Sequence, residues 1–148
     1  MLLAEDNEKD VMLFKHALEE STRETRLNIN LQIVSDGEQA IEYLSGQGKF
    51  ANRVFYRFPD IIVLDLKMPR MNGLEVLRWL QQHEEYRRIP KILLSSSSLD
   101  QDVDEAYRLG TNTYFQKPAT LEELRELVHH MISYWAHTQR PVIRHAVA

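Results

Sequence analysis

Short hydrophobic runs alternate with stretches of helical spacing along most of the chain. Residues 61–64 and 92–94 are continuously hydrophobic, which is typical of central parallel strands covered by helices on both faces. Residues 27–33 instead alternate hydrophobic and polar side chains, which indicates a strand at the sheet edge with one face toward water. Because the chain shows five alternations of strand and helix, we predict an α/β fold with a parallel sheet and crossover helices.

The remaining elements follow from the same periodicities. A helix begins at Glu8, and its hydrophobic face fades in the polar segment 21–26. Residues 46–59 carry aromatic side chains among Arg and Lys without a regular period, which predicts either a functional loop or a packed insertion. The other predicted elements are strands at 2–4 and 113–116, and helices at 74–80, at 103–107 and from 121 toward 138.

Length and composition limit the classes of protein to which the chain can belong. With 148 residues, 43% of them hydrophobic, we expect one domain. A net charge of −4 with scattered basic residues argues against nucleic-acid binding. The absence of cysteine excludes disulfides and thiolate zinc sites, and no hydrophobic run is long enough to cross a membrane. No signal peptide precedes Glu5 and Asp6, so we expect a cytoplasmic protein.

Acidic residues directly follow two of the predicted strands. Glu5 and Asp6 come after the first strand, and Asp65 comes after the third. The carboxyl ends of parallel strands meet at one edge, where open sheets bind ligands, so we expect the three carboxylates to lie together. They would repel one another unless a cation bridged them, and an all-oxygen donor set suits Mg2+. Ser95 ends the fourth strand and Lys117 follows the fifth, which predicts a hydroxyl and an ammonium at the same edge.

These residues stand in short motifs that follow one another in a specific order. The motifs are LAEDN (3–7), LDLKMP (64–69), NG (72–73), LSS (94–96) and YFQKP (114–118). Together they resemble the response-regulator receiver domains, of which the chemotaxis protein CheY is the familiar member, from Leu2 to about Tyr134. The resemblance implies a flavodoxin-like (βα)5 doubly wound sheet of five parallel strands in the order 2-1-3-4-5. It also implies a receiver domain at residues 1–138 and a C-terminal tail at 139–148.

The resemblance implies a role for each residue of the acidic edge. Asp65 is the phosphoacceptor and, with Asp6, a ligand of Mg2+, while Glu5 acts on the metal largely through water. Lys67 binds the metal through its backbone carbonyl, and Lys117 neutralises charge on the phosphoryl group. The chain is then not a conventional enzyme, but catalyses its own Mg-dependent phosphorylation.

Two serines and a tyrosine carry the switch that the resemblance implies. The Ser95 hydroxyl and the Ser96 backbone amide bind the new phosphoryl oxygens, and Tyr114 swings inward when Ser95 moves. Ser95 stands where Thr is commoner, and both supply a hydroxyl. Neither Lys67 nor Ser97 offers a carboxylate or amide to orient a water, so we expect slow autodephosphorylation.

A closer resemblance concerns the partners. The EYLSG segment at 42–46, the insertion before Pro59 and the extended last helix are similar to single-domain regulators that serve bacterial and cyanobacterial phytochrome kinases. This implies a sensor histidine kinase as phosphoryl donor and a downstream protein target or phosphotransfer protein. It also implies a homodimer, formed either through the helix at 103–107, the strand at 113–116 and the last helix, or through a C-terminal arm at 142–145. A disordered tail is the alternative for that arm.

Other functions would share some of these features. An aspartate-nucleophile phosphatase would resemble its relatives in a second Asp where this chain has Lys67. A flavin mononucleotide binder would need a phosphate-cradling loop after the first strand, and none follows it. A degenerate receiver that only binds partners would not need the retained acids, hydroxyl and lysine. Glu5 and Asp6 taken alone could simply cap the following helix.

Overall fold

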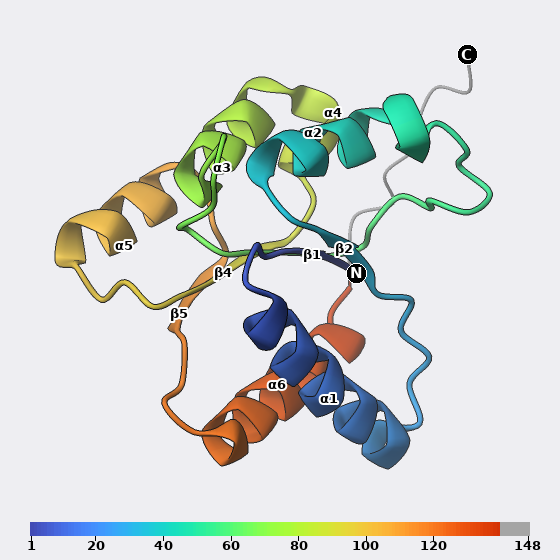
Figure 1. Ribbon diagram of the computed structural model, residues 1–148, viewed down its shortest axis with the longest axis vertical. Coiled ribbons are helices and arrows are strands. Elements are labelled where there is room, and N and C mark those ends of the chain that lie inside the picture. The colour runs from blue at the N-terminus through green and yellow to red at the C-terminus, as the bar shows by residue number, and fades with distance from the viewer. Residues whose placement is uncertain (140–148) are drawn as a thin grey trace.

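Five parallel strands form one sheet in the order β2-β1-β3-β4-β5. The computed structural model describes residues 1–139, and its strands lie between two layers of helices (Figure 1). This confirms the predicted doubly wound sheet and its strand order, with β2 at one edge. The strands are β1 Leu2–Ala4, β2 Gln32–Val34, β3 Ile62–Leu64, β4 Lys91–Ser95 and β5 Thr113–Gln116.

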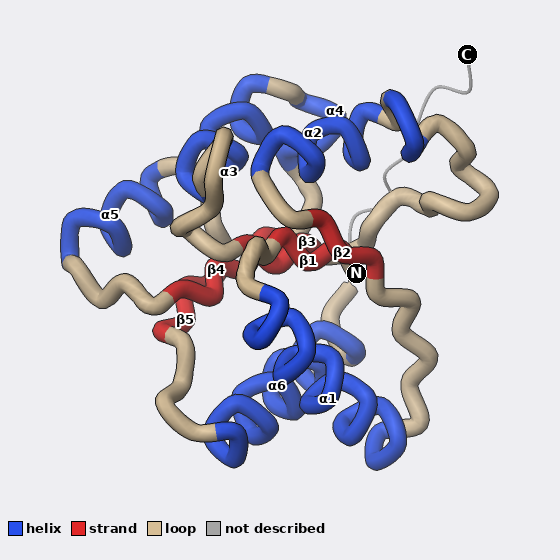
Figure 2. The backbone as a smooth tube through the Cα atoms, in the orientation of Figure 1, coloured by secondary structure: helices blue, strands red, loops and turns tan. Residues whose placement is uncertain are grey.

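Figure 2 shows α1 and α6 on one face of the sheet and the other α-helices on the opposite face. A hydrophobic cluster lies between the sheet and each helix layer, and the central strand β3 contributes side chains to both clusters. Ile62 and Leu64 point into the cluster under α2 and α3, while Val63 points into the cluster under α1 and α6. The helices are α1 Glu8–Thr25, α2 Gly37–Ser45, η1 Gly48–Phe50, α3 Gly73–Gln82, α4 Glu84–Arg87, α5 Asp100–Arg108 and α6 Leu121–Ala136.

The unbroken hydrophobic runs of the central strands are explained by this two-sided burial. Ile62, Val63 and Leu64 are all fully buried, and so are Ile92 and Leu93 of β4. A strand with helices on both faces has no face that water can reach, so no polar alternation is needed. The prediction of two central strands at these runs is therefore confirmed.

Two predicted boundaries differ from the structure. Helix α1 does not fade at residue 21, because Ser21 is buried and the Thr25 hydroxyl donates to its carbonyl at 2.7 Å. The prediction of a strand over 27–33 is wrong for most of that range, since β2 holds only Gln32–Val34. Strand β1 is three residues long and pairs Leu2 with Gln32, so the ladder offers no partner for the preceding residues. Leu27 and its hydrophobic neighbours pack against the second cluster as an irregular connection.

The inner part of the segment 46–59 packs against the end of α2, whereas Val54 and Phe55 in it are exposed. Arg53 donates to the carbonyls of Tyr43 at 2.7 Å and Tyr56 at 3.1 Å, and so ties the insertion to the end of α2. The rings of Tyr43, Phe50 and Tyr56 meet edge to face, with centroids 5.1–6.1 Å apart. The structure thus favours the packed alternative for its inner part. The proposed C-terminal arm at 142–145 lies outside the described residues.

Candidate functional site

The three predicted acids come together at the carboxyl edge of the sheet. Strands β1 and β3 pair Ala4 with Leu64, so Glu5 and Asp65 continue side by side past the ladder. The Asp65 amide donates to the Ala4 carbonyl at 2.9 Å, which holds the two strand ends in register. Carboxylate oxygens of Glu5, Asp6 and Asp65 all lie within 4.8 Å of one another. Within residues 1–139, these three acids form the one cluster of acidic or histidine side chains whose geometry could hold a metal ion.

Glu5 and Asp65 are each 5% exposed, whereas Asp6 faces solvent. Burial raises the pKa of Glu5, and hydrogen bonds from Lys117 and the Asn7 amide oppose that rise. Buried carboxylates this close repel one another, so a hard cation held by their oxygens fits the donor set.

Lys117 reaches into the same site from the end of β5. Its amide donates to the Ser95 carbonyl at 2.8 Å, which extends the β4–β5 ladder by one residue. Its Nζ lies 2.7 Å from Glu5 Oε2, 2.8 Å from Asp10 Oδ2 and 3.3 Å from Asp65 Oδ2. Burial opposes the charge of Lys117, but the hydrogen bonds to Asp10 and Glu5 outweigh it and raise the pKa of Lys117 well above its ordinary value. The ammonium is therefore charged at neutral pH.

Asp10 is a residue of this site that the sequence reasoning missed. It stands in the first turn of α1, where acids are common because they complement the helix dipole, so its sequence position carries no separate signal. Only the packing of α1 against α6 on this face of the sheet brings its carboxylate to Lys117, 107 residues away along the chain.

The loop from Asp65 to Gly73 is held tightly against the site. The Lys67 amide points toward Asp65 Oδ1 at 3.4 Å, and the Lys67 side chain is exposed. The Gly73 amide donates to the Leu66 carbonyl at 2.9 Å, and a Cβ on Gly73 would lie 2.4 Å from the Asp65 carbonyl oxygen. The Asn72-Gly73 turn is thus required because no side chain fits where α3 begins behind Asp65.

The same loop is also held by an ion pair that the sequence reasoning did not predict. Asp36, which is fully buried at the start of α2, pairs with Arg70, whose Nε donates to it at 3.1 Å. Arg70 has φ +62°, and beside it the Gly37 amide donates to the Met71 carbonyl at 3.0 Å. Burial disfavours the Asp36 carboxylate, yet the hydrogen bonds from Arg70 and the Gln39 amide hold the pKa of Asp36 below its ordinary value. The pair fastens the loop after Asp65 to the neighbouring strand connection.

The predicted switch residues meet at Ser97. Ser95 is fully buried, and its Oγ accepts from the Ser97 amide at 3.2 Å. The Tyr114 hydroxyl donates to the Ser97 carbonyl at 2.9 Å, and the Ser97 hydroxyl donates to Asp102 in the first turn of α5. Ser96 is exposed beside them. Ser97 therefore connects the site, through Ser95, with both α5 and β5.

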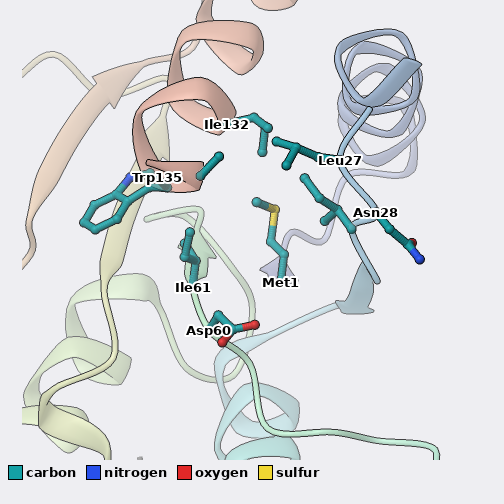
Figure 3. A pocket seen from close by; sticks show the side chains of 9 residues that line it. Met1, Leu27, Asn28, Asp60, Ile61, Ile132 and Trp135 are labelled. Carbon is teal, nitrogen blue, oxygen red and sulfur yellow. The ribbon is translucent and has the colours of Figure 1, made fainter. Parts of the chain in front are cut away.

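A separate pocket opens at the opposite end of the strands. It has a volume of about 160 Å³ and is lined by residues that include Met1, Leu27, Ile61, Ile132 and Trp135 (Figure 3). Of the side chains labelled in Figure 3, Asn28 and Asp60 are polar and the others are hydrophobic. Because Met1 and Ile61 precede β1 and β3 while the acids follow them, this pocket is not part of the acidic site.

Residues 1–139 contain no helix that is both long and hydrophobic enough to span a membrane.

Comparisons with known proteins agree with this geometry. The family model described as "Response regulator receiver domain" matches residues 1–129. The chain is 34% identical to response regulator Rcp1 of Synechocystis sp. over 138 residues, which are 93% of this chain and 89% of Rcp1. It superposes on the phosphorylated cyanobacterial phytochrome response regulator RcpA with a TM-score of 0.86, at 34% identity and 95% and 96% coverage of the two chains.

The Mn2+-bound form of Rcp1 gives a TM-score of 0.85 at 33% identity, with 95% of this chain and 97% of that chain covered. A metal-bound structure and a phosphorylated structure thus stand among the similar proteins. With the acidic edge and Lys117, these likenesses assign the chain to phosphorylation-based signalling. The chain belongs to the response regulator receiver domains.

Proposed function

We propose that this protein is a single-domain regulator whose receiver, residues 1–138, accepts a phosphoryl group on Asp65. The observation that carries the proposal is the contact of one ammonium, Lys117, with both Glu5 and Asp65 within the cluster of three carboxylates. A buried carboxylate beside a charged amine and further acids suits the transfer of a dianionic group, because the charges of donor and acceptor must be balanced at one place.

The transfer needs little from the protein beyond position and charge. An Asp65 carboxylate oxygen attacks the phosphorus of a phosphohistidine on the kinase, a P–O bond forms, and the P–N bond breaks. The released imidazole takes its proton from solvent. Lys117 then stabilises the negative phosphoryl oxygens, for which its Nζ already lies 3.3 Å from Asp65 Oδ2.

We propose Mg2+ as the cation of this site. Glu5, Asp6 and Asp65 would supply its carboxylate oxygens, and the Lys67 carbonyl would supply a further oxygen, while histidine and thiolate ligands are absent from this set. Bound Mg2+ would supply positive charge opposite the transferred group. The relative Rcp1 binds Mn2+, which accepts the same kinds of oxygen ligand.

Signalling would begin when the Ser95 hydroxyl and the Ser96 amide bind the phosphoryl oxygens. Ser95 Oγ accepts from the Ser97 amide, so its movement changes the position of Ser97, to which Tyr114 and Asp102 are bound. The surface formed by α5, β5 and α6 would then present a different face to a downstream protein or a phosphotransfer protein. The same surface, or the C-terminal arm, would serve a homodimer.

A sensor histidine kinase is the partner that a receiver requires, and we propose a phytochrome kinase. The likeness to RcpA, a cyanobacterial phytochrome response regulator, supports this choice. Copurification of the kinase with this protein, and phosphotransfer to it faster than to an unrelated receiver, would test the assignment.

Incubation with Mg2+ and acetyl phosphate, followed by a phosphate-affinity gel, tests the phosphoacceptor. Asp65→Asn should lose labelling, while Asp60→Asn, which removes an exposed acid at the opposite end of β3, should keep it. Labelling that requires Mg2+ and stops on chelation is expected. Labelling of Asp65→Asn at the wild-type level would exclude Asp65 as the acceptor.

We further propose that the phosphoryl group is lost slowly. Lys67 and Ser97 flank the approach to Asp65. The Lys67 side chain offers no carboxylate or amide, and the Ser97 hydroxyl already donates to Asp102, so neither side chain orients an attacking water. Lys67→Asn, which offers an amide, should shorten the phosphoryl half-life, and a half-life equal to that of the wild type would contradict this account.

A further inference from the structure

Lys117 binds one carboxylate more than the proposed phosphorylation chemistry uses. Its three ammonium protons face Glu5, Asp10 and Asp65, and the contact with Asp10 at 2.8 Å is shorter than that with Asp65 at 3.3 Å. Asp10 comes from helix α1, whereas the other two acids come from strand ends. Asp10 also lies outside the cluster of acids that could hold a metal, so the metal does not explain its position.

The start of α1 is built so that Asp10 can make this contact. Asp10 is the third residue after the N-cap Asn7, as Glu75 is after Asn72 in α3 and Glu123 is after Thr120 in α6. In α3 and α6 this glutamate returns to the N-cap amide and completes a capping box.

In α1 the Asn7 amide instead donates to Glu5 Oε1 at 3.0 Å, so it is not available to the Asp10 carboxylate. The Asn7 side chain accepts from the Asp10 amide at 3.1 Å and fixes the first turn. The Asp10 carboxylate is therefore available to Lys117.

We propose that Asp10 is a positioning residue that holds the Lys117 ammonium before phosphorylation and gives it up to a phosphoryl oxygen afterward. This proposal rests on the proposed function of Asp65. An ammonium with three protons and three acceptors has no donor left for the new group, so one acceptor must leave.

Burial decides which acceptor leaves. Glu5 has a side chain that is 5% exposed, and losing Lys117 would leave its charge buried and poorly compensated. The Asp10 side chain is 36% exposed, so water can replace the ammonium at little cost. Phosphorylation of the other carboxylate oxygen, Oδ1, leaves Asp65 Oδ2 as a carbonyl acceptor, so Asp65 keeps its contact with Lys117. Asp10 is thus the partner that exchanges.

The charge of Asp10 should act on two steps with opposite signs. It adds negative potential beside the three metal-binding acids, which favours a divalent cation. It also neutralises Lys117 and repels an incoming phosphate, which disfavours phosphorylation. A purely structural role for Asp10 would impair both steps together.

The experiment compares Asp10→Asn with Glu8→Gln. Both variants remove one acid from the first turn of α1, but Glu8 is exposed and is not among the carboxylates bound to Lys117. Binding of Mn2+ to the unphosphorylated protein is measured by calorimetry, and the initial rate of labelling by acetyl phosphate is measured at saturating Mg2+. Circular dichroism verifies that both variants are folded.

We expect Asp10→Asn to weaken Mn2+ binding by about two- to fivefold and to speed labelling by a similar factor, with smaller changes in Glu8→Gln. Equal effects of the two variants, or a loss of both metal binding and labelling in Asp10→Asn alone, would overturn the proposal. If the wild type were not labelled at all, the proposed function of Asp65 would fail and the exchange with it. Labelled wild type with unchanged Asp10→Asn would refute only the role of Asp10.

Discussion

The buried Lys91 should make the stability of this protein rise with pH in the alkaline range. Lys91 begins β4 with a residue exposure of 5%, and its Nζ donates to the carbonyls of Arg87 at 2.7 Å and Ile89 at 2.9 Å. Within the described part of the chain, no acid forms an ion pair with it. Burial, together with the positive charge of Arg87, lowers the pKa of Lys91 from 10.5 to about 8.

The sign follows from the protons bound by each state. Below about pH 8 Lys91 is charged in both the folded and the unfolded protein, and the folded protein bears the full cost of burying that charge. Between about pH 8 and 10 the unfolded chain keeps the proton while the folded protein releases it, so the free energy of unfolding rises with pH. A shift from 10.5 to about 8 corresponds to about 3 kcal/mol in total, with a slope of at most about 1.4 kcal/mol per pH unit.

The assay is urea denaturation of the wild type and Lys91→Met at pH 7, 8, 9 and 10, followed by circular dichroism. Taking the difference between the two proteins cancels other alkaline titrations, such as those of Tyr43 and Tyr86, whose pKa values burial raises. We expect the wild type to gain about 2 kcal/mol relative to Lys91→Met between pH 8 and 10. Lys9→Met, at an exposed lysine, should show no such change. A difference between wild type and Lys91→Met that stays constant across this range would refute the reasoning.

Other substitutions test the anchoring of the site and the core. Gly73→Ala places a Cβ 2.4 Å from the Asp65 carbonyl oxygen. It should therefore lower the free energy of unfolding, measured by urea denaturation, by about 1–3 kcal/mol and slow labelling by acetyl phosphate. Wild-type values of both would contradict the close packing. The carboxylate of Asp36, whose pKa lies below 3.8 in the folded protein, should stabilise the fold above about pH 4 and lose this effect as the pH falls through the lower folded value. Asp36→Asn, which keeps the helix cap, should abolish this acid sensitivity. Asp36→Ala also removes the cap, so its free energy of unfolding at neutral pH should be about 1 kcal/mol lower than that of Asp36→Asn. Equal stabilities of the two variants would argue against the cap. Leu77→Ala, at a fully buried side chain, should lower the free energy of unfolding by about 2–5 kcal/mol without preventing labelling at Asp65.

Local patterns were sufficient for the central sheet and for most of the acidic edge. The runs that became β3 and β4 were recognisable because both their faces are buried, and that property is written into consecutive residues. Glu5, Asp6, Asp65 and Lys117 were predictable as neighbours because each follows a parallel strand directly, and such strands end at one edge.

Prediction was poorer where an element depends on what lies beside it. The alternation at residues 27–33 is a sound strand pattern, but only Gln32–Val34 found a partner, since β1 is short. The polar stretch after Leu18 stayed helical because Ser21 is covered by the rest of the fold. Periodicity describes what one face of a segment can bury, and it does not say which neighbour is present.

The sequence by itself determined the α/β class, the central strands, the family and the acids of the site, because these depend on short-range pattern and on strand ends. Tertiary structure alone decided that Asp10 shares Lys117, that Asp36 holds Arg70, and that Ser97 joins Ser95 to Tyr114. Each of these contacts joins a residue of a type that is common in helix starts and loops to a partner that packing brings near. Acids in first helical turns and serines in loops are frequent in any sequence, and only the arrangement of helices on the sheet selects the few that meet a charge or a hydroxyl.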